Sequence, residues 1–525
     1  MKKTYILLSF VLFSCFNIAA QDSIFIYKDN QVINKYATAD IDSITFKQVE
    51  VIAEPELTSF SFGPAENTFL YQKINGKIKD NTITLGVPYK SRKLVASFTT
   101  GAGNTVTVDG VEQESGVTVN DFTNTVTYTV TTPQNKTAQY SVTVNWVTGL
   151  PSITINTVDA APIVSKEEYI RAYVEIDGKG FYENFADSTR IRGRGNTTWS
   201  YPKKPYRLKL DNDGIPFGLA KEKDWVLLAN YLDPTHLLNP VAMTIGQMLE
   251  LPFTNHVVPV TVTLNGQYQG VYTFTEQVER SKTRVNIDKK KGALLELDQY
   301  FDEDFKFKSE KYNLPVMVKD PDLAEDFKTP EESTAAFDKI KSDFAELENA
   351  LVDPNFPNNN YKDLIDIESV VKFLLVFDIT SNLELNHPKS TYMHKDDGKK
   401  YYMGPIWDFD WAYGYESTGK HFETYQEPAL KMLSSSSTGY PFFSRFLDDP
   451  AVKALYKSTW NEFKQNNFQK LIEYIEINFE NIREDQILDR NVWNKGTSDY
   501  PNKINQFKTW LNNRAGFIDA KVAGW

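Results

Sequence analysis

Residues 404–414 read GPIWDFDWAYG, and this stretch decides how the rest of the chain is interpreted. Asp408 and Asp410 stand two positions apart among bulky aromatic residues. In an extended segment both carboxylates would point the same way, and paired oxygen donors suit a hard divalent cation. Unpaired carboxylates in apolar surroundings are costly, so a metal ion or a basic partner is expected. A structural role for the two aspartates is the alternative.

Residues 378–390, upstream of this stretch, read DITSNLELNHPKS. They concentrate acids, amides, a histidine and a lysine directly after an apolar helical run. Such a density of polar groups in a loop favours function. Asn and Asp also populate ordinary turns, which is the alternative.

A glycine- and arginine-rich segment lies at residues 190–199, which read RIRGRGNTTW. Gly193 and Gly195 would allow a backbone to approach a ligand closely. Arg192 and Arg194 favour a phosphate-like anion. A tight turn with solvated arginines fits the same residues.

Residues 203–210 follow at once and read KKPYRLKL. From Tyr206 the pattern alternates as in a strand, which puts Arg207 and Lys209 on one face. A lysine on a strand beside a Gly-rich loop is the arrangement that nucleotide phosphates require. An ordinary half-exposed strand is the alternative.

A hairpin is expected at Asn265-Gly266, with its second strand ending on Glu276. That carboxylate could orient a lysine, or it could be a surface or capping residue. Helices dominate after residue 325: Thr329, Asp366 and Asp449 each have the residue type and position of a helix cap. Strands first and helices later predict an α+β fold for residues 151–525.

The first twenty residues have the pattern of a secretory signal, with Lys2 and Lys3 before an apolar run and small residues up to Ala20. A bacterial lipoprotein site with lipidated Cys15 is the alternative. Either form predicts export to the periplasm, the cell surface or the medium. No later stretch reaches the ~18 apolar residues of a membrane span.

Composition excludes several classes of protein. The chain of 525 residues carries a net charge of −12, which argues against nucleic-acid binding. Its single cysteine excludes a disulfide scaffold and a multi-cysteine zinc site. Its five histidines form no HExxH motif, which excludes a zincin.

The chain is expected to divide into four parts. Residues 1–20 are the signal, and residues 21–53 are a short β segment or linker similar to that of many exported proteins of Bacteroidetes. Residues 54–148 contain short strands rich in Val and Thr, which predict an immunoglobulin-like β-sandwich with a stalk or adhesion role. Residues 151–525 carry all the motifs above.

These motifs, together and in this order, resemble the CotH kinase family, which is named for a spore-coat protein. The resemblance covers roughly residues 150–525. The matching phrases are RGRGNTTW at 192–199, KPYRLK at 204–209, LLANYLD at 227–233, GVYTFTE at 270–276, LLELD at 294–298 and PIWDFD at 405–410.

The resemblance implies an atypical protein-kinase-like fold that binds ATP with Mg²⁺ or Mn²⁺. Its activity would be transfer of the γ-phosphoryl group to Ser or Thr of secreted or surface proteins. Phosphate-binding residues would include Arg192, Arg194 and either Lys204 or Lys209, with Glu276 paired to that lysine. Asp408 would be the principal metal ligand, with Asp410 as second ligand or support.

The family's catalytic aspartate corresponds to Glu384 here, with Asn386 beside it. Glutamate can accept a hydroxyl proton, but its extra methylene moves the carboxylate by roughly an ångström, and such a misplacement can cost ~100-fold in rate. A weak or inactive kinase-like surface protein is therefore the competing hypothesis, and a glycoside hydrolase is a third. Convergence of Asp408, Glu384 and Lys209 on one cleft would favour the enzyme.

Overall fold

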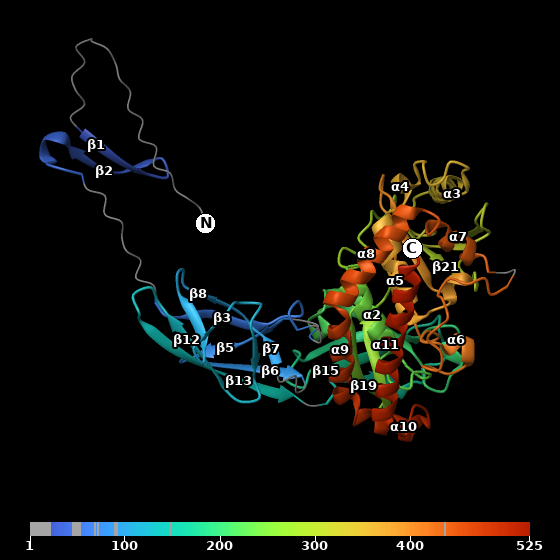
Figure 1. Ribbon diagram of the computed structural model, residues 1–525, viewed down its shortest axis with the longest axis horizontal. Helices are drawn as coiled ribbons and strands as arrows, with labels where there is room; N and C mark the ends of the chain where they lie inside the picture. The colour runs from blue at the N-terminus through green and yellow to red at the C-terminus, as the bar shows by residue number, and fades with distance from the viewer. Residues whose placement is uncertain are drawn as a thin grey trace, which may run out of the picture. The chain divides into compact units, whose positions relative to one another are not determined.

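The protein, as a computed structural model, is described for residues 23–44, 54–67, 70, 73–88, 93–147, 149–434 and 437–525 (Figure 1). The signal segment with Cys15 lies outside these residues. The chain forms two units, residues 1–54 and 55–525. The first holds an antiparallel hairpin of β1 (Ser23–Lys28) and β2 (Gln31–Ala37) and a short 3-10 helix, Thr38–Asp40. Within the described residues, no helix has the length and apolarity needed to cross a membrane.

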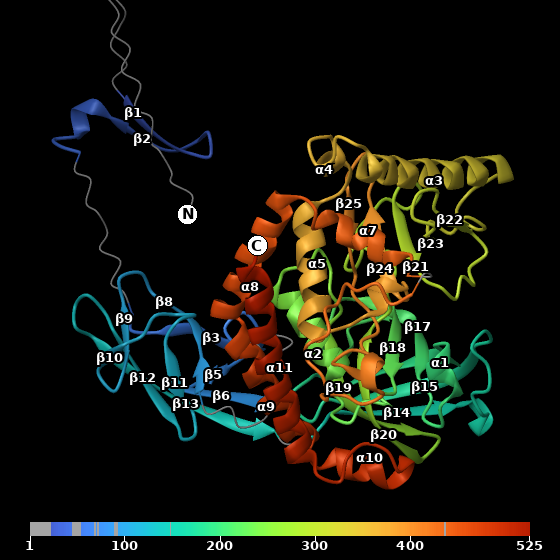
Figure 2. The same ribbon diagram turned by 45° about the vertical axis from the view of Figure 1, so that its right-hand side comes forward.

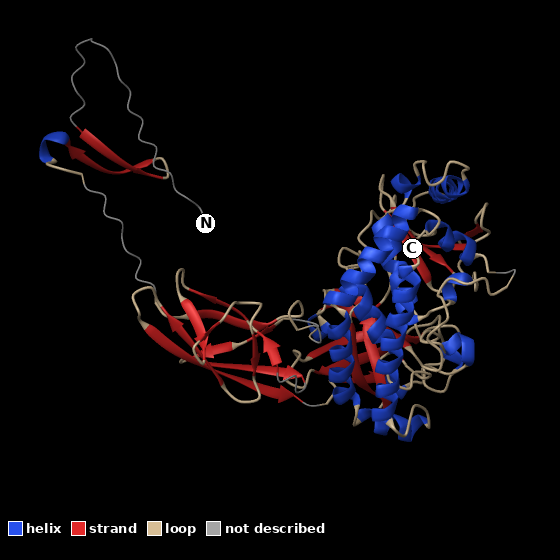
Figure 3. Ribbon diagram, viewed as in Figure 1, coloured by secondary structure: helices blue, strands red, loops and turns tan. Residues whose placement is uncertain are grey.

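The second unit begins with a β-sandwich, drawn almost entirely as strands in Figure 3. One sheet has the order β10-β9-β12-β13-β6-β5, and smaller sheets pair β4-β3-β8 and β11-β7. In β12 the residues Val126, Tyr128 and Val130 are buried and alternate with half-exposed threonines, as the sequence predicts. The Phe60 and Phe122 rings pack against Tyr128 in the core. The strands are β3 (Leu57–Phe62), β4 (Ile74–Asn75), β5 (Lys77–Lys79), β6 (Thr82–Pro88), β7 (Lys93–Val95), β8 (Ser97–Thr100), β9 (Thr105–Val108), β10 (Val111–Glu112), β11 (Val119–Asp121), β12 (Val126–Thr131) and β13 (Thr137–Val147).

A closed barrel follows, with the strand order β14-β15-β16-β17-β18-β20-β19. All neighbours are antiparallel except β14 and β19, whose parallel pairing closes the barrel. Its strands are β14 (Ser152–Thr157), β15 (Ile170–Asp177), β16 (Phe185–Gly193), β17 (Tyr206–Gly214), β18 (Glu222–Leu228), β19 (Val257–Leu264) and β20 (Gln267–Glu276).

Strand β17 alternates as predicted. Tyr206, Leu208 and Leu210 pack with the other apolar residues of the barrel strands, whereas Arg207 and Lys209 face outward. The predicted hairpin is present: Asn265-Gly266 joins β19 to β20, and both residues have the positive φ that a tight two-residue turn requires.

The remainder of the chain is a five-stranded antiparallel sheet with helices, which completes the α+β fold expected from the sequence (Figure 3). The sheet has the order β22-β23-β21-β24-β25, with β21 (Ala293–Leu297), β22 (Lys306–Lys308), β23 (Pro315–Asp320), β24 (Thr391–Lys395) and β25 (Tyr401–Met403). The α-helices are α1 (Thr197–Ser200), α2 (Leu238–Met248), α3 (Pro330–Val352), α4 (Tyr361–Leu364), α5 (Ile367–Thr380), α6 (Tyr415–Thr418), α7 (Gly439–Phe446), α8 (Pro450–Asn466), α9 (Phe468–Ile482), α10 (Asp485–Trp493) and α11 (Tyr500–Ala523).

Three helices begin at the caps that the sequence predicts. The side chains of Thr329, Asp366 and Asp449 accept hydrogen bonds from backbone N–H groups in the first turns of α3, α5 and α8. Helix α5 is buried along nearly its whole length and contacts α2, α8 and α11 (Figure 2). The carboxyl end of α5 is therefore held in place by packing, and the polar loop of residues 381–390 follows it directly.

Candidate functional site

A pocket of about 420 Å³ lies where the barrel meets the five-stranded sheet and the loops beyond α5. Its lining comes from segments that are far apart in sequence. They include residues 192–198 at the end of β16 and after it, Arg207 on β17, residues 228–232, Glu296 and Asp298 on and after β21, then Glu384, Lys389, Ser390 and Tyr392, and finally Trp407, Asp408, Asp410 and Trp411.

Asp408 and Asp410 both line this pocket, but the segment that carries them is not extended. Residues 404–410 form no strand, and Asp408 has a φ of 63°, so the extended geometry assumed from the sequence is wrong. The loop is instead held by Asn239 of α2, whose Nδ2 donates to Asp410 Oδ1 at 2.7 Å and whose Oδ1 accepts from the Phe409 N–H at 2.8 Å. Two side-chain contacts from a buried helix therefore fix the loop.

Both carboxyl groups are held in an environment that disfavours their charge. Withdrawal from water raises the pKa of Asp408, against the lowering effect of Arg194. The pKa of Asp410 is also raised, by burial and then by the neighbouring Asp408. Two acids that resist ionisation side by side mark a place where a bound cation would be strongly favoured.

Glu384 lies in the same pocket, in a 3-10 turn of Glu384–Asn386 that follows α5. Asn382 Oδ1 accepts from the Glu384 N–H at 2.9 Å, and the Lys389 Nζ lies 4.0 Å from the Glu384 carboxylate. Burial, and then repulsion from Asp408, raises the pKa of Glu384 well above its usual value. This carboxyl group therefore holds its proton more tightly than an ordinary glutamate does.

Asn386, in contrast, does not line the pocket. Its Nδ2 donates to the carbonyl groups of Leu383 and Ala429, both at 2.8 Å, and its Oδ1 accepts from the Lys431 N–H at 2.8 Å. The side chain is fully buried and its bonds join the 384–390 loop to residues 429–431. The structure thus gives Asn386 a role in holding the loop rather than a place at the site.

The glycine- and arginine-rich loop forms one wall of the pocket, but its first glycine serves packing rather than ligand approach. A Cβ at Gly193 would lie 2.2 Å from the Trp199 ring, so the ring occupies the space where a side chain would be. Arg192 and Arg194 both line the pocket. Arg192 donates to the Lys166 carbonyl, and the Arg194 guanidinium lies 5.2 Å from the centre of the Trp407 ring.

The expected pairing of Glu276 with Lys204 or Lys209 does not form, and none of the three lines the pocket. Glu276 is buried and pairs with His256, at 2.7 Å from Nδ1. The Lys204 Nζ donates to the Trp199 carbonyl at 2.6 Å, and the Lys209 Nζ lies 3.8 Å from Asp224. Glu276 ends β20, and its carboxylate contacts His256, the residue directly before β19, which no local sequence pattern could reveal.

Several cations that line the pocket were not among the predicted site residues. Arg207 lines the pocket in place of Lys209, two residues nearer the start of the same strand. Lys319 on β23 lies 3.3 Å from Glu296, and Lys389 packs 4.5 Å from the centre of the Trp411 ring. The alternation of β17 identified the correct face for Arg207, but not which end of the strand meets the pocket.

The donor set fits a divalent cation that shares its coordination with a ligand. Within the described part of the chain, no group of three or more His, Cys, Asp or Glu residues is arranged to hold a metal ion. Mg²⁺, however, is commonly held by one or two carboxylates together with water and substrate phosphates. Asp408 and Asp410 supply such carboxylates beside the cations of the same pocket.

Comparison with known proteins gives four findings, of which three come first. A sequence model of the SGBP N-terminal domain matches residues 58–144, the region of the β-sandwich. No curated protein matches the chain. A crystal structure from Bacteroides thetaiotaomicron, provisionally assigned as a glycoside hydrolase, is 14% identical over 55% of this chain and 89% of its own, with a TM-score of 0.16. A likeness this weak carries no argument.

The remaining finding concerns the part of the chain that builds the pocket. A sequence model described as CotH kinase protein matches residues 191–518, which is more than half of the chain and contains the arginine loop, Glu384 and Asp408. The chain therefore belongs to the CotH kinase protein family.

Proposed function

We propose that the protein binds ATP with Mg²⁺ or Mn²⁺ and transfers the γ-phosphoryl group to Ser or Thr of secreted or surface proteins. One observation carries this proposal. Glu384, Asp408 and Arg194 come from three distant segments and line a single polar pocket in a chain of this family. Phosphoryl transfer depends mainly on positioning and charge neutralisation, and the pocket offers the groups for both.

The cations of the pocket would hold the phosphate groups. Arg194 and Arg207 come from neighbouring segments of the barrel and Lys319 comes from β23 of the five-stranded sheet, and all three line the pocket. Arginine suits phosphate because its planar fork can donate two parallel hydrogen bonds. A metal ion held at Asp408 and Asp410 would neutralise charge on the phosphates.

The transfer step is then a simple displacement. The acceptor hydroxyl oxygen forms a bond to the γ-phosphorus, and the bond from that phosphorus to the β,γ-bridging oxygen breaks, so that ADP leaves with the electron pair. Glu384 would receive the hydroxyl proton when its carboxylate is ionised, a state that Lys389 at 4.0 Å favours. Because the transition state is loose, the proton transfer needs only a weak base.

A second candidate function is nucleotide binding without efficient transfer. The observation that favours it is the pKa of Glu384, which burial and Asp408 raise well above the usual value. A raised pKa lowers the fraction of Glu384 that is ionised, so fewer molecules can accept the proton of the acceptor hydroxyl. The two candidates share the nucleotide pocket and differ only in turnover.

Titration calorimetry with ATP and Mg²⁺, together with radiolabel transfer from γ-labelled ATP to a mixture of secreted proteins, tests the proposal. Wild-type binding that is lost in Asp408→Ala, with unchanged circular dichroism, supports the nucleotide site. Label transfer that is lost in Glu384→Gln supports the kinase, whereas binding with no transfer at any pH supports the second candidate. No binding by the wild type with either metal rejects both.

We also propose the division of labour that the sequence suggests. Residues 54–148 would act as a stalk or adhesion module, supported by the β-sandwich and the domain match at 58–144. Residues 151–525 would form the kinase-like domain, which acts outside the cytoplasm after removal of the signal in residues 1–20. Expression of residues 151–525 alone, followed by ATP titration, tests whether the nucleotide site is independent of the sandwich.

A further inference from the structure

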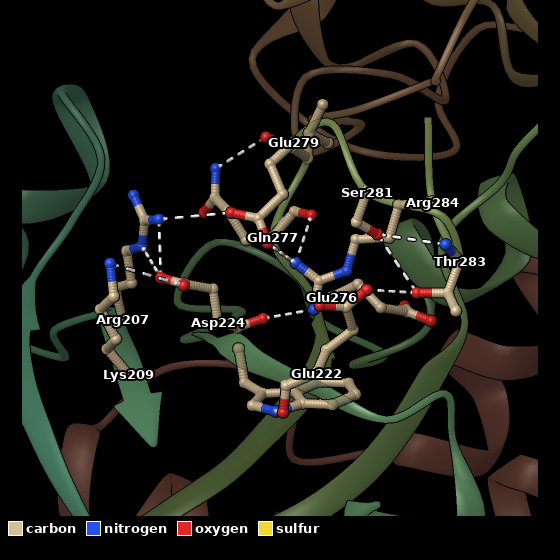
Figure 4. Close-up of polar contacts among 12 residues, drawn as sticks. Arg207, Lys209, Glu222, Asp224, Glu276, Gln277, Glu279, Ser281, Thr283 and Arg284 are labelled. Carbon is tan, nitrogen blue, oxygen red and sulfur yellow. Dashed lines mark hydrogen bonds and ion pairs between the residues drawn. The ribbon is translucent and has the colours of Figure 1, made fainter. Parts of the chain in front are cut away.

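An ion-pair network stands on the outer face of the barrel, at the edge of the pocket (Figure 4). Its centre is Asp224 of β18, which is buried and contacts two cations of the neighbouring strand β17. Lys209 is the residue directly opposite Asp224 in the strand pairing, yet Arg207 makes the stronger contact. Asp224 Oδ1 accepts from Arg207 Nε at 3.0 Å and from a terminal guanidinium nitrogen at 2.7 Å, whereas the Lys209 Nζ stays 3.8 Å away.

Glu279 is the second carboxylate that contacts Arg207. Its carboxylate lies 3.6 Å from the terminal guanidinium nitrogen of Arg207 that also donates to Asp224. Glu279 is itself bonded to Arg284, whose side chain is only 1% exposed. Arg284 also donates to the Asp224 carbonyl at 2.6 Å and to the Gln277 carbonyl at 3.1 Å. Both residues that hold Arg207 thus contact one buried arginine, Glu279 through its carboxylate and Asp224 through its backbone carbonyl.

This arrangement leaves one edge of the Arg207 guanidinium free. Nε and Nη2 are occupied by the two carboxylates, and among the described residues no hydrogen bond or ion pair occupies Nη1. In Figure 4 one terminal nitrogen of Arg207 carries no dashed line. Arg207 lines the pocket and Lys209 does not, so the free edge belongs to a residue at the pocket wall.

We infer that Asp224 and Glu279 are positioning residues that hold Arg207 so that its free edge binds a phosphate group of the nucleotide, an inference that rests on the proposed function. A flexible arginine loses rotamer freedom when it binds an anion, and a side chain that is already fixed avoids this loss. Two carboxylates also offset the cost of keeping the guanidinium partly buried before the ligand arrives. The alternative is that the network only joins β17, β18 and residues 277–284.

A double-mutant cycle on the full-length protein separates these roles. The variants are Arg207→Gln, Asp224→Asn and the double mutant, each titrated by calorimetry with ATP and with AMP in the presence of Mg²⁺. Loss of one charge-assisted contact predicts about 10- to 100-fold weaker ATP binding for Arg207→Gln. Asp224→Asn should weaken ATP binding by about 5- to 10-fold, and the double mutant should bind no worse than Arg207→Gln.

The ligand comparison adds a readout that a purely structural role would not change. AMP carries fewer phosphate groups, so its affinity should fall by a smaller factor than that of ATP in the same variants. Arg207→Lys keeps the charge but removes the fork, and it should still lose most of the ATP affinity. Glu279→Gln removes a longer contact, so it tests the same idea if Asp224→Asn fails to fold.

Asp211→Asn is the matched control. Asp211 lies on the same strand and accepts two hydrogen bonds from Arg171, each 2.7 Å, but neither residue lines the pocket. The Asp211→Asn variant should bind ATP as the wild type does. Wild-type ATP affinity in Asp224→Asn, or additive losses in the double mutant, would overturn the inference while leaving the proposed function intact. Failure of wild type and control alike to bind ATP would overturn both.

Discussion

Arg514 offers the sharpest test of how the site is supported, because it is fully buried and binds both the end of α5 and residues 425–427. On α11, its Nε donates to the Asp378 carbonyl at 2.6 Å, and one terminal nitrogen donates to the Tyr425 and Glu427 carbonyls, both at 2.7 Å. The other terminal nitrogen lies 3.3 Å from the Asp378 carboxylate. Asp378 is near the end of α5, before the loop that carries Glu384.

Arg514→Met keeps the length of the side chain but removes all these bonds. Removal of one partner from a buried ion pair costs about 3–5 kcal/mol. Lys521 and Tyr456 remain on the Asp378 carboxylate, so that charge keeps a partner and the ion-pair loss is limited. The Asp378 and Glu427 carbonyl groups keep bonds from the N–H and the hydroxyl of Ser381, whereas the Tyr425 carbonyl loses the Arg514 bond, which adds about 1–3 kcal/mol to the cost. We therefore expect a loss of about 3–5 kcal/mol in the free energy of unfolding.

The same substitution has a defined pH dependence. Burial alone raises the pKa of Asp378, but Lys521 and Arg514 outweigh it, so the folded-state pKa is below the usual value. A lowered folded-state pKa means stability that is present above the unfolded-state value and is lost as the pH falls through the folded-state value. The stability difference between wild type and Arg514→Met should therefore narrow in acid, where Asp378 is protonated in both.

Urea denaturation followed by tryptophan fluorescence at pH 7 and in steps down to pH 3 measures both effects. Arg483→Met is the control, because Arg483 is half exposed and makes an ion pair with Glu480 within one helical turn, a contact that contributes little. A loss below about 1 kcal/mol for Arg514→Met would refute the reasoning, since so small a cost is typical of an exposed pair. If the stability difference between wild type and Arg514→Met is as large in acid as at pH 7, the Asp378 carboxylate is not the partner through which Arg514 stabilises the fold.

Three further outcomes are expected. Gly193→Ala should lower the free energy of unfolding by about 1–3 kcal/mol in a thermal or urea melt, because its Cβ would lie 2.2 Å from the Trp199 ring; Trp199→Ala in the same background should recover part of it. Burial raises the pKa of Glu279 to about 7, although Arg284 acts in the opposite direction, so the stability that comes from protonated Glu279 should be lost as the pH rises from about 4.5 through about 7. If urea denaturation of Glu279→Gln shows the same loss over this pH range, Glu279 is not its source. Mass spectrometry of the exported protein should find cleavage after Ala20 and no effect of Cys15→Ser on export; a lipid on Cys15 would favour the lipoprotein alternative.

Local sequence signals predicted local structure well. The caps at Thr329, Asp366 and Asp449 and the Asn265-Gly266 turn depend on neighbouring residues alone, and each forms as predicted. The alternation of β17 also holds, because a strand with one face in a barrel core must keep its apolar residues on that face. These features needed no knowledge of the rest of the chain.

The site was only partly predictable, because it depends on which strand ends and loops meet. Glu384, Asp408 and Arg194 line one pocket, whereas Lys209 lies outside it although it shares the face of Arg207. Which of two cations on one face reaches a pocket depends on the position of the pocket along the strand, and this is tertiary information. Asp408 lines the pocket although its φ of 63° is not that of the extended segment in which the two carboxylates would point the same way.

The two sides of the pocket come from different halves of the chain, and this has a consequence for how the site is kept together. The barrel supplies Arg207, and the later half supplies Asp408. Helix α10 returns to the barrel, where Asp489 pairs with buried Lys203 and accepts from the Val271 N–H at 2.8 Å. Because Lys203 lies three residues before the strand that carries Arg207 and also lines the pocket, this contact fixes the barrel side of the pocket from the C-terminal end. A nucleotide that bridges both sides would then stabilise the whole domain rather than one half.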